Sequence, residues 1–201
     1  YRKLKDSFRP DQPASWKKNK NEWLTTDNID NVMKQYEEAH PSFKYSGAIP
    51  IDFSLKDNDG NCKVNELCQL NISELMDQGK KSIGIVFNVD PHTKGGQHWF
   101  TMYIDLVGKN QKNKPFIYYF DSIQGDIQDE IYHLISNIKN QYEMNYPSKE
   151  IGFTYNDIQH QYGTTECGIY CLHFLTEMLQ GRSFNGYINN KMNDNDMEKF
   201  R

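Results

Sequence analysis

The sequence predicts one α+β domain in which a central mixed sheet is flanked by helices. Runs rich in aromatic and β-branched residues at 83–89, 99–106 and 116–120 are typical of strands. A long apolar run that begins at Ile169 predicts a buried helix. A second predicted helix carries an apolar stripe at helical spacing, formed by Ile127, Ile131, Leu134, Ile135, Ile138 and Tyr142. Strands interspersed with such helices predict this fold class.

The remaining elements follow in order along the chain. Residues 1–21 are polar and basic and contain two prolines, so we expect an N-terminal arm before a single domain over residues 22–201. Thr26 is expected to cap a helix, because the apolar residues after it (Ile29, Val32, Met33, Tyr36) lie on one helical face. Three further elements are expected: a strand at 49–53, a helix at about 71–79 and a strand at 151–158.

Length and charge exclude several classes of protein. A chain of 201 residues can bury close to about 70% of its unfolded surface in one core. The net charge of −4 argues against a nucleic-acid groove, and no apolar run reaches the length of a membrane span. The first residues lack the hydrophobic region of a signal peptide, and the four cysteines lack the spacing of a small disulfide scaffold. We therefore expect a monomer without nucleic acid or membrane partners, in an intracellular reducing compartment.

A cysteine stands on a glycine hinge near the C-terminal end, in the segment Gln161-Tyr-Gly-Thr-Thr-Glu-Cys167-Gly168. The apolar run after it places Cys167 at the predicted N-terminus of a helix. Backbone N–H groups and the helix dipole favour negative charge at that position, and a thiolate is the reactive form of cysteine. Cys167 is therefore a candidate nucleophile.

A nucleophilic cysteine needs a base, and the base needs an orienting group. His98 stands directly before the predicted strand 99–106, and Asp121 directly follows the strand 116–120. A short polar loop joins these two strands, which predicts an antiparallel pair. The start of one strand and the end of the other then lie at the same edge of the sheet, so we expect His98 and Asp121 to meet there.

The order of these motifs resembles a known group of enzymes. Three motifs are similar to the pattern of the ubiquitin-like-protein protease and adenain clan of cysteine peptidases: His98-Trp99, Asp121-Ser122, and Gln161 six residues before Cys167-Gly168. Trp23-Leu24 resembles the N-terminal Trp-Leu element of the sentrin-specific branch. The segment Thr-Glu-Cys-Gly and the tail Asp194–Arg201 look most similar to processing proteases of large DNA viruses, of the African swine fever virus type. The resemblance covers about residues 22–180 and implies a papain-like cysteine protease core.

The resemblance implies a thiol protease that hydrolyses peptide or isopeptide bonds after Gly-Gly through a thioester. The catalytic roles that the resemblance implies are Cys167 as nucleophile, His98 as base and Asp121 as the acid that orients the base. It also implies that Gln161 contributes to the oxyanion hole and that Trp23 and Trp99 clamp the Gly-Gly sequence. The expected substrate is a viral polyprotein or a conjugate of a ubiquitin-like modifier, in host cytoplasm or virion. The family's Trp-Leu-Asn-Asp continues here as Trp-Leu-Thr-Thr-Asp27, so an acid that grips the modifier is absent or displaced.

Other interpretations remain to be weighed. An acetyltransferase of the same clan uses the same triad, but it needs a basic surface for its cofactor, and no basic cluster is seen. A binding protein without activity would not need an intact triad. Cys167, Cys171 and His173 lack the four ligands of a structural zinc site, and the Asp57–Asn61 turn lacks the Glu that completes a calcium loop. We therefore expect no metal and no cofactor, and polyprotein and modifier substrates remain alternatives.

Overall fold

The fold is built on a five-stranded mixed sheet. The computed structural model describes residues 11, 14–19 and 21–201. The strands lie side by side in chain order: β1 (Phe43–Pro50), β2 (Ser82–Asn88), β3 (Trp99–Asp105), β4 (Phe116–Phe120) and β5 (Gly152–Tyr155). The outer pairs β1–β2 and β4–β5 are parallel, whereas β3 is antiparallel to both β2 and β4. The predicted fold class and the antiparallel pairing of the strands on either side of 107–115 are confirmed.

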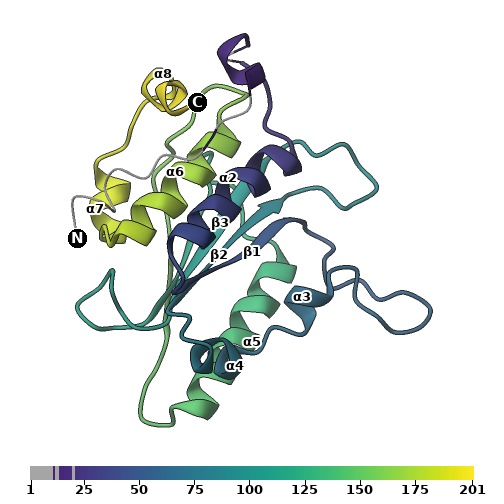
Figure 1. Cartoon of the computed structure of the whole chain (residues 1–201), viewed down its shortest axis with the longest axis vertical. Coiled ribbons are helices and arrows are strands. Elements are labelled where there is room, and N and C mark those ends of the chain that lie inside the picture. The colour runs from purple at the N-terminus through teal and green to yellow at the C-terminus, as the bar shows by residue number, and fades with distance from the viewer. Residues whose placement is uncertain (1–10, 12–13, 20) are drawn as a thin grey trace.

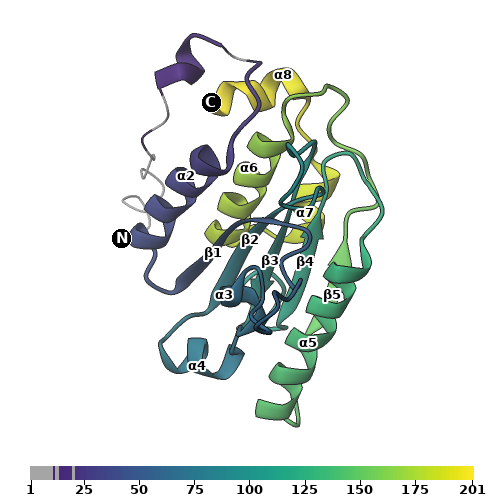
Figure 2. The ribbon, with the colours of Figure 1, turned by 90° about the vertical axis from the view of Figure 1, so that its right-hand side faces the viewer.

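Helices cover both faces of this sheet (Figures 1 and 2). One face carries α2 (Thr26–Ala39), α6 (Cys167–Gln180) and α7 (Phe184–Asn189). The other carries α3 (Asn65–Cys68), α4 (Ile72–Asp77) and α5 (Asp129–Asn145). Short helices near the two chain ends are η1 (Ala14–Lys17), α8 (Asp194–Met197) and η2 (Glu198–Phe200). Among the described residues, no helix combines the length and apolar character needed to cross a bilayer.

The two covered faces produce two hydrophobic clusters. Successive strand residues point to opposite faces, so Tyr103 of β3 packs with α2 and α6, while its neighbour Met102 packs with α5. Every residue of β2 and β3 is buried, because helices cover both sides of these central strands. Trp16, which we placed in an N-terminal arm, is buried in the cluster on the α6 face. The arm boundary stays a prediction, and residues 1–10, 12–13 and 20 lie outside the described part of the chain.

Several element boundaries differ from the sequence-based expectations, and those of α2, β1 and β5 are the most informative. The N-cap of α2 is Thr25 rather than Thr26, because Thr25 and Asn28 exchange hydrogen bonds in a capping box. The first strand is β1 and not the alternation at 49–53. A bulge at Gly47, whose φ is +107°, interrupts the alternating pattern that would have revealed it. The last strand, expected over 151–158, ends at Tyr155.

Two of the four cysteines are joined. Cys62 and Cys68 form a disulfide in the connection between β1 and β2, which we did not expect from their spacing. Cys167 and Cys171 are free and buried. The expectation of a reducing compartment stays a prediction.

Candidate active site

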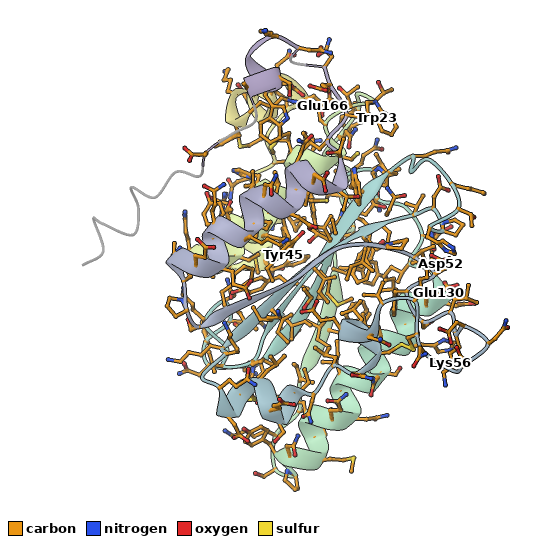
Figure 3. All side chains as sticks on the ribbon, turned by 45° about the vertical axis from the view of Figure 1, so that its right-hand side comes forward. Trp23, Tyr45, Asp52, Lys56, Glu130 and Glu166 are labelled. Atoms are coloured by element: carbon orange, nitrogen blue, oxygen red, sulfur yellow. A yellow bond between two sulfur atoms is a disulfide. The ribbon has the colours of Figure 1, made fainter. Side chains whose placement is uncertain are left out.

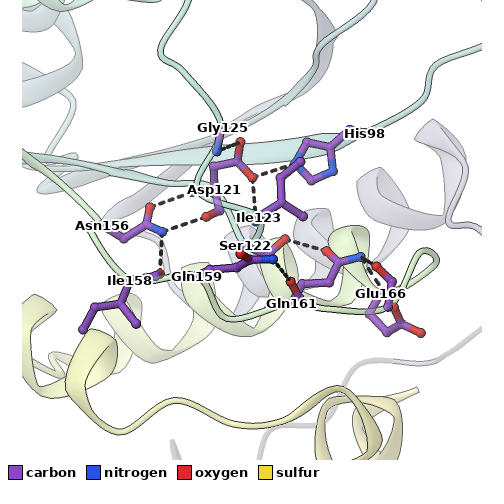
Figure 4. A network of polar contacts seen from close by, with 11 residues as sticks. His98, Asp121, Ser122, Ile123, Gly125, Asn156, Ile158, Gln159, Gln161 and Glu166 are labelled. Carbon is purple, nitrogen blue, oxygen red and sulfur yellow. Dashed lines mark hydrogen bonds and ion pairs between the residues drawn. The ribbon is translucent and has the colours of Figure 1, made fainter.

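The sheet edge where β3 begins and β4 ends brings an imidazole and a carboxylate together. His98 immediately precedes β3 and Asp121 immediately follows β4. His98 Nε2 lies 2.6 Å from Asp121 Oδ1 (Figure 4). This bond fixes the ring and leaves Nδ1 as the nitrogen for a second partner.

A tight turn holds the Asp121 carboxylate in place. The backbone N–H of Ile123 donates to Oδ1 at 3.0 Å, and that of Gly125 donates to Oδ2 at 3.1 Å. A Cβ on residue 125 would lie 2.7 Å from Oδ2, so a larger residue would push against the carboxylate. Glycine is required here because the backbone itself approaches the carboxylate.

Asn156 supports the same aspartate from a third strand, and the sequence analysis missed it. It follows β5, the parallel neighbour of β4, so both strand ends lie at one edge. Its Oδ1 accepts from Asp121 N at 2.9 Å, and its Nδ2 donates to Asp121 O at 2.7 Å and to Ile158 O at 3.1 Å (Figure 4). Asn156 is buried. A polar residue directly after the strand next to β4 was the available signal.

Cys167 is the first residue of α6, the position that the glycine hinge predicts. Its N–H has no carbonyl four residues earlier in the helix to bond, so the helix provides no acceptor for this donor. Gly168 allows the segment at Leu24 to pack against this first helical turn, because a Cβ there would lie 2.8 Å from Leu24 Cβ. Cys167 itself is 2% exposed.

The electrostatics of His98 link the carboxylate to the thiol. Burial lowers the pKa of His98, but its hydrogen bond to Asp121 and its electrostatic interactions with Asp121 and Cys167 raise it to about 9. An imidazole held between a carboxylate and a thiol at a helix N-terminus is the arrangement that nucleophilic acyl transfer requires.

Gln161 lies in the wall of the same groove. Its Oε1 accepts from Ser122 Oγ at 2.7 Å, and its Nε2 donates to Gly163 O at 3.1 Å (Figure 4). Nε2 also lies 3.5 Å from Glu166 Oε2, at the outer limit of a hydrogen bond. Ser122, adjacent to Asp121, therefore orients the amide of Gln161.

The two tryptophans occupy different environments. Trp23 is 41% exposed and lines the groove, at the same end of the molecule as Glu166 (Figure 3). Trp99 is 7% exposed and donates its indole N–H to Leu24 O at 3.0 Å. Trp99 thus holds the residue that follows Trp23. The expected clamp of Trp23 and Trp99 on a Gly-Gly sequence stays a prediction.

The groove has a volume of about 590 Å³ and is lined by residues from three parts of the chain, among which Cys167 and Trp99 are not found. Its lining includes Trp23, His98, Asp121 and Gln161. The described residues that line it contain no lysine or arginine.

His160 and Cys171 are placed for packing. His160 stacks on Tyr187 and meets Phe120 edge-on, and burial lowers its pKa to about 4. Burial raises the pKa of Cys171 well above its ordinary value. His92 bonds to Asp52 through its ring and its backbone N–H.

Known proteins resemble this chain in sequence. A putative thiol protease, R355, of Acanthamoeba polyphaga mimivirus is 29% identical over 97% of this chain and 59% of its own length. The SUMO-1 cysteine protease S273R of African swine fever virus is 25% identical over 89% of this chain and 66% of its own length. The chain thus spans less than two thirds of both relatives.

Solved structures share its fold. The crystal structure of the African swine fever virus pS273R protease has a TM-score of 0.77 at 22% identity, over 99% of this chain and 72% of that chain. A second structure is that of the Ulp1 protease domain in complex with Smt3, the yeast ortholog of SUMO. It has a TM-score of 0.54 at 17% identity, over 90% of this chain and 73% of that chain.

The family comparison covers almost the entire sequence. A model of the family described as YopJ Serine/Threonine acetyltransferase matches residues 2–199. The chain therefore belongs to the YopJ serine/threonine acetyltransferase family, within the clan of cysteine peptidases that its motif order resembles.

Proposed function

We propose that this chain is a cysteine protease that hydrolyses peptide or isopeptide bonds through a thioester on Cys167. The observation that carries the proposal is the position of His98, which bonds to Asp121 at 2.6 Å and whose pKa Asp121 and Cys167 together raise to about 9, with Cys167 at the first residue of α6. At neutral pH such an imidazole is protonated, and its charge stabilises a thiolate beside it.

Each step of the reaction has a group to perform it. The Cys167 sulfur attacks the carbonyl carbon, and the oxyanion accepts hydrogen bonds from the Cys167 N–H and the Gln161 amide. Gln161 would reach the oxyanion by giving up its long contact to Glu166, at 3.5 Å the weaker of its two donated bonds. His98 protonates the leaving amine, and the carbonyl remains on sulfur as a thioester.

Hydrolysis then releases the enzyme. His98, now neutral, takes a proton from water, and the hydroxide formed attacks the thioester carbonyl. The carboxylic acid product leaves, and the proton on His98 restores the ion pair with Cys167. Asp121 holds the ring and stabilises its positive charge in both half-reactions.

We assign the acyl side of the substrate to a Gly-Gly sequence. Trp23 presents a flat, exposed ring in the groove, and a narrow gap beside an indole admits glycine but excludes a Cβ. Curated relatives are named SUMO-1 cysteine proteases, and Ulp1 has been solved with Smt3. The substrate classes are therefore conjugates of a ubiquitin-like modifier and Gly-Gly sites in a viral polyprotein.

The test uses matched substrates. Ubiquitin-like modifiers with a C-terminal Gly-Gly amide and short peptides Gly-Gly-X are incubated with the protein and with its Cys167→Ala variant. We expect cleavage after Gly-Gly that the variant loses by several orders of magnitude. Preference for modifiers over peptides would identify a deconjugating enzyme, and equal cleavage a polyprotein protease. Failure to cleave any of these substrates would contradict the proposal.

Membership of the acetyltransferase family supports a second candidate activity. Cys167 would take the acetyl group of acetyl-coenzyme A as a thioester and release the thiol of coenzyme A. The acetyl group would then pass to a serine or threonine hydroxyl, which would restore the Cys167 thiol. The groove does not favour this, since its lining within the described part of the chain offers no lysine or arginine to meet cofactor phosphates. Acetylation of Cys167 by acetyl-coenzyme A, without Gly-Gly cleavage, would select the second activity.

We also propose that the protein acts as a monomer in a reducing compartment. In that compartment Cys62 and Cys68 would be dithiol, and Cys167 would remain unoxidised. Light scattering of the purified protein and differential thiol labelling of virus-infected cells test these two statements separately.

A further inference from the structure

The residues that line the groove come from two parts of the fold. Trp23 and Gln161 line the part next to α6, where Cys167 begins its helix. Phe100 and Tyr119 line another part, and both belong to the cluster that packs against α5. We call this second part the α5-side pocket.

The α5-side pocket has an apolar lining with an acidic residue. Val89, whose N–H donates to His98 O at 3.0 Å, lies next to the two aromatic rings, which are 5.3 Å apart. Ile123 is 42% exposed in the turn after Asp121 and lines the same space. Asp126 lines it too and is exposed.

The chemistry of the proposed reaction assigns the two parts to the two sides of the scissile bond. The oxyanion donors, Cys167 N–H and Gln161, lie with the α6 part, so the acyl group is held there. His98 must deliver its proton to the departing amine. The residues attached to that amine therefore extend past His98, toward the α5-side pocket.

The negative charge of the α5-side pocket favours some substrate residues after the scissile bond over others. Over residues 11, 14–19 and 21–201, no lysine or arginine lines the groove, and Asp129 and Glu130 in the first turn of α5 add to the negative charge of Asp126. Asp126 is exposed and lines the pocket, so a cation on the substrate would be attracted to its carboxylate.

We propose that the α5-side pocket binds the residues that follow the scissile bond and that it prefers an apolar residue followed by a basic one. This inference rests on the proposed protease activity. Val89, Phe100, Tyr119 and Ile123 contact the apolar side chain, and Asp126 pairs with the basic side chain. Specificity would then arise on both sides of the cut.

The test compares substrates that differ only after the bond. Four peptides continue Gly-Gly with Leu-Lys, Leu-Glu, Gly-Lys or Gly-Glu, and a fifth substrate carries an aminocoumarin amide directly after Gly-Gly. We expect kcat/KM for Leu-Lys to exceed that for Leu-Glu roughly fivefold to tenfold, with a smaller ratio at high salt. Leucine should exceed glycine roughly tenfold next to the bond.

Two variants locate the effect. Asp126→Lys should reverse the preference between Leu-Lys and Leu-Glu, whereas Asp77→Lys, the same charge change on an exposed residue of α4, should leave the ratio unchanged. Because the readout is a ratio, a general loss of activity in a variant does not affect it.

The outcomes separate this inference from the function on which it rests. Cleavage of the aminocoumarin substrate with equal rates for all four peptides would overturn the pocket assignment and leave the protease activity intact. A ratio that Asp126→Lys does not change would overturn it as well. Failure to cleave any of the five substrates would overturn both proposals.

Discussion

At the scale of single residues, the geometry of His98 depends on groups that never touch the substrate. Asn156 satisfies both the N–H and the carbonyl of Asp121 from the neighbouring strand. Asn156→Ala would leave these buried groups without partners, at about 1–3 kcal/mol of unfolding free energy. The carboxylate would also shift, so we expect kcat/KM to fall roughly tenfold to a hundredfold.

A pH profile distinguishes this positioning role from a loss of stability alone. A looser Asp121 raises the pKa of His98 less, so the alkaline limb of kcat/KM should move to lower pH in Asn156→Ala. The control is Asp157→Ala, an exposed neighbour. An unchanged alkaline limb in Asn156→Ala would show that Asn156 does not position the pair.

The raised pKa of His98 predicts how stability and activity depend on pH. Its value of about 9 exceeds the ordinary 6.5, so the pairing stabilises the fold fully below pH 6.5 and is lost as the pH rises through about 9. Activity should decline over the same alkaline range, because neutral His98 no longer stabilises the thiolate or protonates the amine. In Cys167→Ala the contribution of the thiol is absent, and NMR titration should find a His98 pKa below that of the parent protein. An equal or higher value would contradict the assigned contact.

At the scale of elements, the first turn of α6 and the chain at Leu24 require each other. A Cβ at residue 168 would meet Leu24 at 2.8 Å, and Trp99 holds the Leu24 carbonyl from the other side. Gly168→Ala should lower the unfolding free energy by about 1–3 kcal/mol and raise KM for Gly-Gly substrates, since Trp23 moves with Leu24. Urea denaturation and steady-state kinetics measure the two effects. The matched control is Gly95→Ala, because no atom lies within 4 Å of the new Cβ. Equal losses of unfolding free energy in Gly168→Ala and Gly95→Ala would refute the packing argument.

At the scale of the whole molecule, the C-terminal segment braces the loop before the nucleophile. Asp194 accepts from the backbone N–H groups of Tyr162 and Gly163 at 2.9 and 2.7 Å, and from the Tyr170 hydroxyl at 2.9 Å. We expect Asp194→Ala to reduce kcat roughly tenfold by freeing the loop that carries Gln161. Asp196→Ala, which removes the exposed side-chain contacts of Asp196 with Asn193 and Lys199, should have little effect. Similar kinetics for the two variants would argue against this brace.

Arg201 adds a second link between distant segments. It bonds the carbonyls of Glu22 and Thr165, and it pairs with Glu198 at 2.7 Å. Arg201 therefore links Glu22, which precedes Trp23, with Thr165, which lies two residues before Cys167.

The sequence predicted features that depend on local patterns. The helix at Cys167 and the antiparallel strands that carry His98 and Asp121 follow from apolar periodicity and a short loop, so their positions could be inferred. The contacts of Asn156 and Asp194 could not, because each joins segments more than 30 residues apart through one polar side chain. Thr25 and Thr26 offer equivalent caps in sequence, and the hydrogen bond with Asn28 decides between them.

The central claim is that the carbonyl of a Gly-Gly tail becomes attached to Cys167. The most direct measurement is peptide-level mass spectrometry after incubation with a ubiquitin-like modifier that carries a C-terminal electrophile. We predict one adduct, on Cys167, that is greatly reduced in His98→Ala, while Cys171 stays unlabelled because burial raises its pKa well above the ordinary value and it lies one turn further along α6. An adduct on Cys171, or labelling of Cys167 by acetyl-coenzyme A but not by the Gly-Gly probe, would contradict this account.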